Sequence, residues 1–261
     1  MADRNRERFL FLAGRYIDRL LVALSALAVF LAFMHHACWR YGADPGNIIA
    51  SYFDLDSEST LGSWYAALLW FSVSLSSLLA WALERWFQSD FRFRFWWLVT
   101  AFVFAVASAD EISMIHETAG ELLEKSLASK GLGTSIWSFF EDSPWLVFYS
   151  LPLFSFIVMT LCFLSDRFSK SKKESLLLAS GFASYIVALI IEFVQGMPAA
   201  KLAPLAGLVF LSARDFYNVS VVVEETLENL GTVLILVAVL WHCHGVVNGV
   251  ICRSGRAGGA E

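Results

Sequence analysis

The sequence has few charged residues and lacks the short motifs that mark common soluble enzymes. Asp, Glu, Lys and Arg make up only 16% of its 261 residues, whereas about a quarter of a typical soluble domain is charged. Its four cysteines form no CxxC pair, which argues against a disulfide framework or a cysteine zinc site. There is no GxSxG motif and no Walker loop. The basic residues form short separate groups instead of one patch, so we expect no nucleic-acid partner.

Apolar residues are abundant, and they are arranged in long runs. Hydrophobic residues account for 57% of the chain and aromatic residues for 15%, and the mean hydropathy is +0.61. Each run is long enough to cross the hydrocarbon core, which is about 30 Å thick. We therefore predict an all-α integral membrane bundle, one domain over residues 1–250, with a disordered tail at 251–261. The six predicted transmembrane helices span about 17–38, 63–87, 95–117, 145–165, 175–197 and 215–242.

The basic residues predict how this bundle is oriented. If the N-terminus is cytoplasmic, fourteen of the nineteen Lys and Arg residues fall in inside segments and five fall outside. Such a bias follows the positive-inside rule, and an even number of spans places both termini in the cytoplasm. We expect a multi-pass protein of the bacterial inner (plasma) membrane.

Carboxylates occur inside three of the predicted spans, where they are costly. An ionisable group at membrane depth costs at least about 2.5 kcal/mol, so it rarely persists without a partner or a task. The third span ends in a run that contains Asp110 and Glu111, and the fifth span carries Glu192. The sixth span carries Glu224, Glu225 and Glu228.

These acids are predicted to lie at similar depths. A rise of about 1.5 Å per residue places Asp110 about 22 Å, Glu192 about 24 Å and Glu224 about 18 Å above the inner edge. If one helix continued from the third span to about Ala128, Asp110 and Glu117 would share a face. The expected outer boundary also carries the residues His35, His36, Glu58, His116 and Glu117.

The preferred hypothesis is a metal site in the outer half of the bilayer. Several neighbouring carboxylates need a compensating cation, and carboxylate and histidine ligands suit a divalent iron, zinc or manganese ion, or calcium with carboxylates alone. The Glu-x-x-His pattern of di-iron bundles is absent. The candidate ligands are Asp110, Glu111, His116, Glu117, Glu192, Glu224, Glu228, His35, His36 and Glu58.

Whether the protein is an enzyme is left open by the sequence. If it is one, the metal would act at the membrane surface on a lipid-like substrate, with Glu117 or Glu225 as the general base. Membrane lipid would then be its partner.

Two alternatives remain beside the metal site. The acids could be proton relays of an ion-coupled transporter component, for which a homo-oligomer would offset the small number of spans. They could also only fix helix packing in a structural subunit. His242 and His244, at the inner end of the sixth span, form an H-x-H pattern that could bind copper or zinc. Since we expect no partner acid nearby, we interpret them as interface residues.

The acidic motifs resemble those of a group of small multi-pass bacterial inner-membrane proteins. The resemblance is carried by the segment from Phe53 to Glu58, by a DExxxxHE motif from Asp110 to Glu117, and by an EExxExxG motif from Glu224 to Gly231. It covers most of the chain. No activity is established for that group, so the resemblance implies positions to examine but no reaction.

Overall fold

The part of the chain that the structure describes is helical and contains no strand, as the composition predicts. The structure is a computed structural model that describes residues 2–41, 48–57, 59–87, 93–129, 144–169, 171–197 and 199–257. Its helices are α1 (Ala2–Tyr41), α2 (Ile48–Tyr52), α3 (Leu61–Phe87), α4 (Phe95–Ser113), α5 (Ile115–Ser129), α7 (Pro144–Phe168), α8 (Lys172–Gln195), α9 (Ala199–Leu208) and α10 (Ala213–Ala257).

Five of the described helices are long and apolar enough to cross a membrane. They lie in α1, α3, α4, α8 and α10. Large apolar side chains such as Phe102 and Ile190 are exposed on their outer faces, which is expected where lipid is the solvent. Helix α7 is 25 residues long and occupies the predicted fourth span, but it is not among the five. The chain is therefore a multi-pass membrane protein by the length and composition of its helices.

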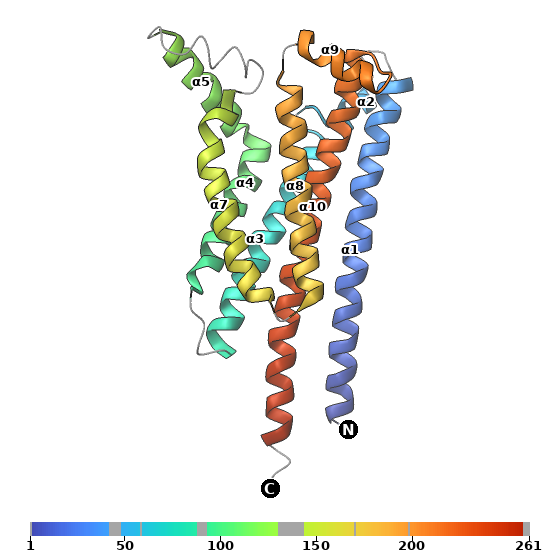
Figure 1. Ribbon diagram of the computed structural model, residues 1–261. Helices are drawn as coiled ribbons and strands as arrows, with labels where there is room; N and C mark the ends of the chain where they lie inside the picture. Colours follow the sequence, from blue (N-terminus) through green and yellow to red (C-terminus); the bar gives the residue numbers. More distant parts are fainter. Residues whose placement is uncertain are drawn as a thin grey trace.

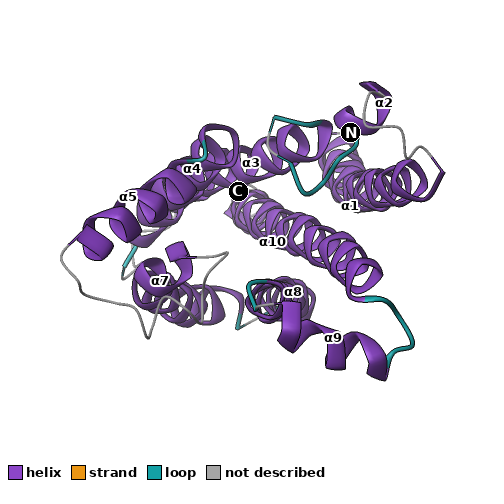
Figure 2. Ribbon diagram, turned by 90° about the horizontal axis from the view of Figure 1, so that it is seen from above, coloured by secondary structure: helices purple, strands orange, loops and turns teal. Residues whose placement is uncertain are grey.

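Helix α10 lies in the middle of the bundle. Seen from above, it runs between α8 on one side and α1 and α3 on the other, while α4 packs against α3 (Figure 2). More than half of its most apolar stretch (56%) is buried, against 11% for α1. Side chains on α10 can therefore meet partners from most of the other helices.

The two longest helices extend past the rest of the bundle at one end. Helix α1 has 40 residues and α10 has 45, and both chain termini lie at this end (Figure 1). Helix α10 continues through Ala257, so the stretch 251–257, for which we expected a disordered tail, is helical. The short helices α2 and α9 lie at the opposite end (Figure 1).

A break separates α4 from α5, where the sequence suggested one continuous helix. Met114 has the left-handed backbone angles φ 52° and ψ 38°, and its amide donates to the carbonyl of Asp110 at 2.8 Å. Such a residue ends an α-helix. The predicted third span, 95–117, therefore ends at Ser113, so the continuous helix assumed for the shared face of Asp110 and Glu117 is interrupted; the side chain of Glu117 lies outside the described residues.

Helices α8 and α10 approach each other at two glycines. A Cβ added to Gly181 would lie 2.9 Å from the carbonyl oxygen of Gly231, and one added to Gly231 would lie 2.9 Å from that of Gly181. Small residues permit such close contact between membrane helices. Glu192 lies about three turns after Gly181 on α8 and Glu224 about two turns before Gly231 on α10, and the two carboxylates are within electrostatic range of each other.

Candidate functional site

A cluster of carboxylates lies between α8 and α10, at the end of the bundle opposite the termini. Its best-defined member is Glu224, whose residue is only 8% exposed. The Oε2 atom of Glu224 accepts a hydrogen bond of 2.6 Å from Nε2 of Gln195. Gln195 is the last residue of α8, so this bond joins the end of α8 to the first third of α10.

Other acids of this group come from four segments of the chain. Glu192 and Asp56 lie within electrostatic range of Glu224. Glu228, one turn further along α10, interacts in the same way with Glu224 and with Glu111 of α4. We call Asp56, Glu111, Glu192, Glu224 and Glu228 the carboxylate cluster. Of the three acids predicted to converge, Glu192 and Glu224 are within electrostatic range of each other, and the residue of α4 that interacts with Glu228 is Glu111.

Tyr185 of α8 lies on the core side of the cluster. Its hydroxyl forms a hydrogen bond with the hydroxyl of Thr232, which also donates to the backbone carbonyl of Glu228 at 2.8 Å. The ring of Tyr185 lies 5.4 Å from that of Trp70. A hydroxyl chain therefore runs from the tyrosine to the backbone of Glu228, and aromatic side chains separate it from the rest of the core.

Asp56 is the member that lies outside the membrane-spanning helices. Its Oδ1 accepts a hydrogen bond of 3.1 Å from the hydroxyl of Tyr217 on α10. Burial raises the pKa of Asp56, and the carboxylate of Asp54 adds to this rise, while the Tyr217 hydrogen bond opposes it. Asp56 therefore ties the segment between α2 and α3 to the start of α10.

The two histidines of α1 do not join the carboxylate cluster as ligands. Nδ1 of His35 accepts a hydrogen bond of 2.9 Å from the backbone amide of Leu55 and lies 3.5 Å from Oδ1 of Asp54. His36 is exposed and its ring lies 5.6 Å from that of Trp39. His35 holds the segment after α2 against α1, and His36 faces outward.

The remaining candidates fall into two groups. Asp110 and Glu225 are half-buried, and the backbone carbonyl of Glu225 accepts a hydrogen bond of 2.9 Å from Asn229. Glu58 lies outside the described residues, as do the side chains of His116 and Glu117. Within the described part of the chain, no three His, Cys, Asp or Glu side chains are grouped to hold a metal ion. The expected metal-binding cluster is therefore not supported there.

One buried polar group was missed in the sequence. His242, interpreted as an interface residue without an acid nearby, is 8% exposed, and its Nε2 lies 2.9 Å from Oε1 of the fully buried Glu84. The interpretation of His242 was wrong because Glu84 is 158 residues away in the chain. The available signal was an acid in the last turn of α3 at the depth of that histidine.

Comparison with known proteins supports a single assignment. No curated protein and no solved structure matches the chain. The match to a family covers residues 21–243, which include every described member of the carboxylate cluster as well as Glu84 and His242. This agrees with the resemblance to an uncharacterised group. The chain belongs to the family described as a domain of unknown function, DUF8692.

Proposed function

We propose that this chain is a six-span protein of the bacterial inner membrane that takes up and releases protons at its carboxylate cluster. The observation that carries the proposal is the buried Glu224, which has Glu228, Glu192 and Asp56 within electrostatic range. Its termini would be cytoplasmic, and the cluster would lie in the outer half of the bilayer.

Like charges at close range are the reason for choosing protons. Among the described residues, neither Glu224 nor Glu228 forms a salt bridge. Carboxylates that share a site of low dielectric cannot all be ionised, so the group retains protons and exchanges them as a unit. Intramembrane carboxylates of this kind serve as relays in pumps and transporters. Gln195 donates to Glu224 and holds one carboxylate in place for such an exchange.

A divalent metal ion is the competing way to neutralise the cluster. Carboxylate oxygens suit calcium or manganese. Of the histidines expected to complete an iron or zinc site, His35 is bonded to Leu55 and His36 is exposed, while the side chain of His116 lies outside the described residues. The donor set of the described residues thus supports a proton better than a shared metal ion.

Proton entry into proteoliposomes tests the proposal. Wild-type protein is expected to collapse an imposed pH gradient, read by an internal pH-sensitive dye, faster than protein-free liposomes. Glu228→Gln keeps the shape of the side chain but cannot release a proton. We expect it to slow proton entry at least about tenfold, because a positioned proton-transfer group contributes about 10²–10⁴-fold.

The matched control is Asp166→Asn, which removes a carboxylate that is 82% exposed at the other end of the bundle and should leave proton entry unchanged. Equal rates for wild type and Glu228→Gln would contradict the proposal. Elemental analysis of the purified protein covers the competing hypothesis. If wild type contains a stoichiometric metal ion that Glu224→Gln lacks, the metal-site hypothesis would replace the proton-exchange proposal.

A further inference from the structure

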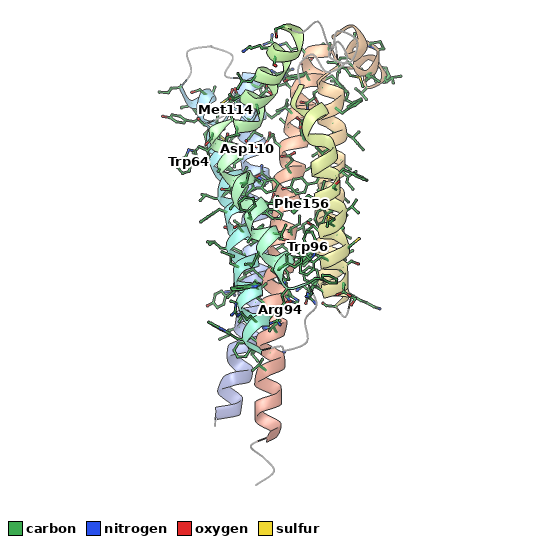
Figure 3. The ribbon with its side chains drawn as sticks, turned by 90° about the vertical axis from the view of Figure 1, so that its left-hand side faces the viewer. Trp64, Arg94, Trp96, Asp110, Met114 and Phe156 are labelled. Carbon is green, nitrogen blue, oxygen red and sulfur yellow. The ribbon has the colours of Figure 1, made fainter. Side chains whose placement is uncertain are left out.

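A second group of buried polar side chains lies at the end of the bundle that carries the termini. Glu84 of α3 is fully buried (0% exposed), and its Oε1 lies 2.9 Å from Nε2 of His242 on α10 and 3.4 Å from Nε of Arg167 on α7. We call these three residues the Glu84 cluster. Arg94 lies just before α4 and within electrostatic range of Arg167. It is far from Asp110, which lies near the other end of α4 (Figure 3).

Among the described residues, several buried polar atoms on α3, α4 and α7 have no hydrogen-bond partner. The ring of Trp97 lies 5.4 Å from that of His242, and Thr100 follows Trp97 by one turn of α4. Thr160 lies on α7, two turns before Arg167. The atoms without a partner are Oε2 of Glu84, Nε1 of Trp97, Oγ1 of Thr100 and Oγ1 of Thr160.

This mixture of donors and acceptors suits water. Buried polar groups in proteins are nearly always hydrogen-bonded, and ordered water commonly supplies the missing partner. The indole of Trp97 can only donate and a carboxylate can only accept, whereas hydroxyls do both. A water molecule can therefore connect atoms here that cannot bond to each other directly.

The charges of the cluster leave one group free to change its protonation. Arg167 is a permanent cation whose positive charge balances the negative charge of the Glu84 carboxylate. A proton on His242 would therefore give the three residues a net positive charge. Four other charged or titratable groups interact with this cluster or with the adjacent Cys243. They are Cys243 on α10, Arg94 beside α4, Asp166 on α7 and Glu174 on α8.

We propose that the Glu84 cluster is a hydrated proton-exchange site, with water as its ligand and His242 and Glu84 as its exchanging groups. In the exchange, the imidazolium of His242 gives its Nε2 proton to Oε1 of Glu84. One N–H bond breaks, one O–H bond forms, and a charged pair becomes a neutral pair. The reverse step returns the proton. This extends the proposed function to a second site, but it stands on different residues.

Nuclear magnetic resonance of ¹⁵N-labelled histidine in the full-length protein tests the site. The chain has five histidines, and His242→Gln identifies the signal of His242 by its loss. We expect the signals of the His242 ring nitrogens to change with pH, because the ring gains and loses a proton in the exchange. Glu84→Gln should alter this pH response, because the imidazolium loses its carboxylate partner.

His244 provides the matched control two residues away on the same helix. Its Nε2 lies 3.0 Å from the backbone carbonyl oxygen of Leu10 and has no carboxylate contact of this kind. His244→Gln should leave the titration of His242 unchanged. Thr100→Val, which keeps the side-chain shape but removes a partner for water, should slow the exchange of the His242 ring proton with deuterated solvent.

A static ion pair is the outcome that would overturn the inference. In that case the His242 signal of the wild-type protein would be constant over the whole pH range. This measurement does not depend on whether any variant folds. A pH response of the His242 signal that is the same in folded Glu84→Gln as in wild type would also overturn it. The proton-entry experiment on Glu228 tests only the carboxylate cluster, and the histidine signals test only the Glu84 cluster. Either proposal can therefore fail without the other.

Discussion

At the scale of single residues, Asp56 predicts how stability depends on pH. Its pKa is raised above the ordinary value of 3.8, first by burial. A carboxyl whose pKa is higher in the folded state contributes stability that is full below the unfolded pKa and is lost as the pH rises through the folded pKa. Asp56→Asn keeps an acceptor for Tyr217 but has no charge to bury. We expect the variant to lose less stability than wild type between acidic and neutral pH.

Thermal unfolding in detergent over a series of pH values measures this effect. Tyr217→Phe is the companion variant, because it removes the hydrogen bond of 3.1 Å and leaves the carboxyl in place. It should destabilise the protein at every pH where the bond forms. Identical pH profiles for wild type and Asp56→Asn would show that burial of this carboxyl does not affect folding.

His35 shows why residue type alone did not identify its role. A histidine near several acids is a typical metal ligand, and the sequence places it on the same side as those acids. In the structure its Nδ1 accepts from the backbone amide of Leu55, which puts the ring proton on Nε2. This bond joins residues 20 positions apart in the chain and depends on how the segment after α2 folds back onto α1.

At the scale of helices, the crossing of α8 and α10 predicts the effect of an added methyl group. Gly231→Ala would place a Cβ 2.9 Å from the Gly181 carbonyl oxygen and 3.2 Å from the ring of Tyr185. Overpacking of this kind costs about 1–3 kcal/mol. We expect a lower unfolding midpoint in detergent and a weaker effect of Glu224 substitutions, since the turns that carry the carboxylate cluster would move apart.

Gly245→Ala is the control on the same helix. A Cβ at Gly245 would meet nothing within 4 Å, and alanine is favoured over glycine in a helix by about 1 kcal/mol. This variant should be as stable as wild type or more so. If Gly231→Ala behaves like Gly245→Ala, the close crossing does not contribute to stability.

The end of α4 illustrates the limit of helix arithmetic. The sequence from Phe95 to Ala128 has no proline or glycine before Gly120, so no local signal ends the helix. The break at Met114 is made by a left-handed residue that is not glycine. Before the break, Glu111 lies within electrostatic range of Glu228, a relation that the helix arithmetic did not predict. Relations across the break could not be predicted.

At the scale of the whole molecule, the positions of the termini predict the result of reporter fusions. Both termini lie at one end (Figure 1), and fourteen of the nineteen basic residues fall in the segments assigned to that side. Green fluorescent protein fused to either terminus should therefore fluoresce in a bacterial host. Alkaline phosphatase, which is active only outside the cytoplasm, should be inactive at both termini and active when fused after Ser129.

The family match separates the membrane core from the projecting ends. It covers residues 21–243, whereas α1 begins at Ala2 and α10 ends at Ala257. Both buried polar clusters lie inside the matched part. The parts of α1 and α10 that extend past the other helices lie largely outside it, so the features common to the family are those of the membrane-spanning bundle.

The sequence by itself determined that this is an all-helical membrane protein and that acids on separate spans lie at similar depths. Apolar runs and the rise of a helix are local properties, so they do not depend on how the helices pack against each other. Only the tertiary structure decided which polar groups meet: Gln195 with Glu224, His35 with Leu55, and His242 with Glu84. These pairs depend on the rotation and crossing of whole helices, which are set by packing contacts such as the one between Gly181 and Gly231.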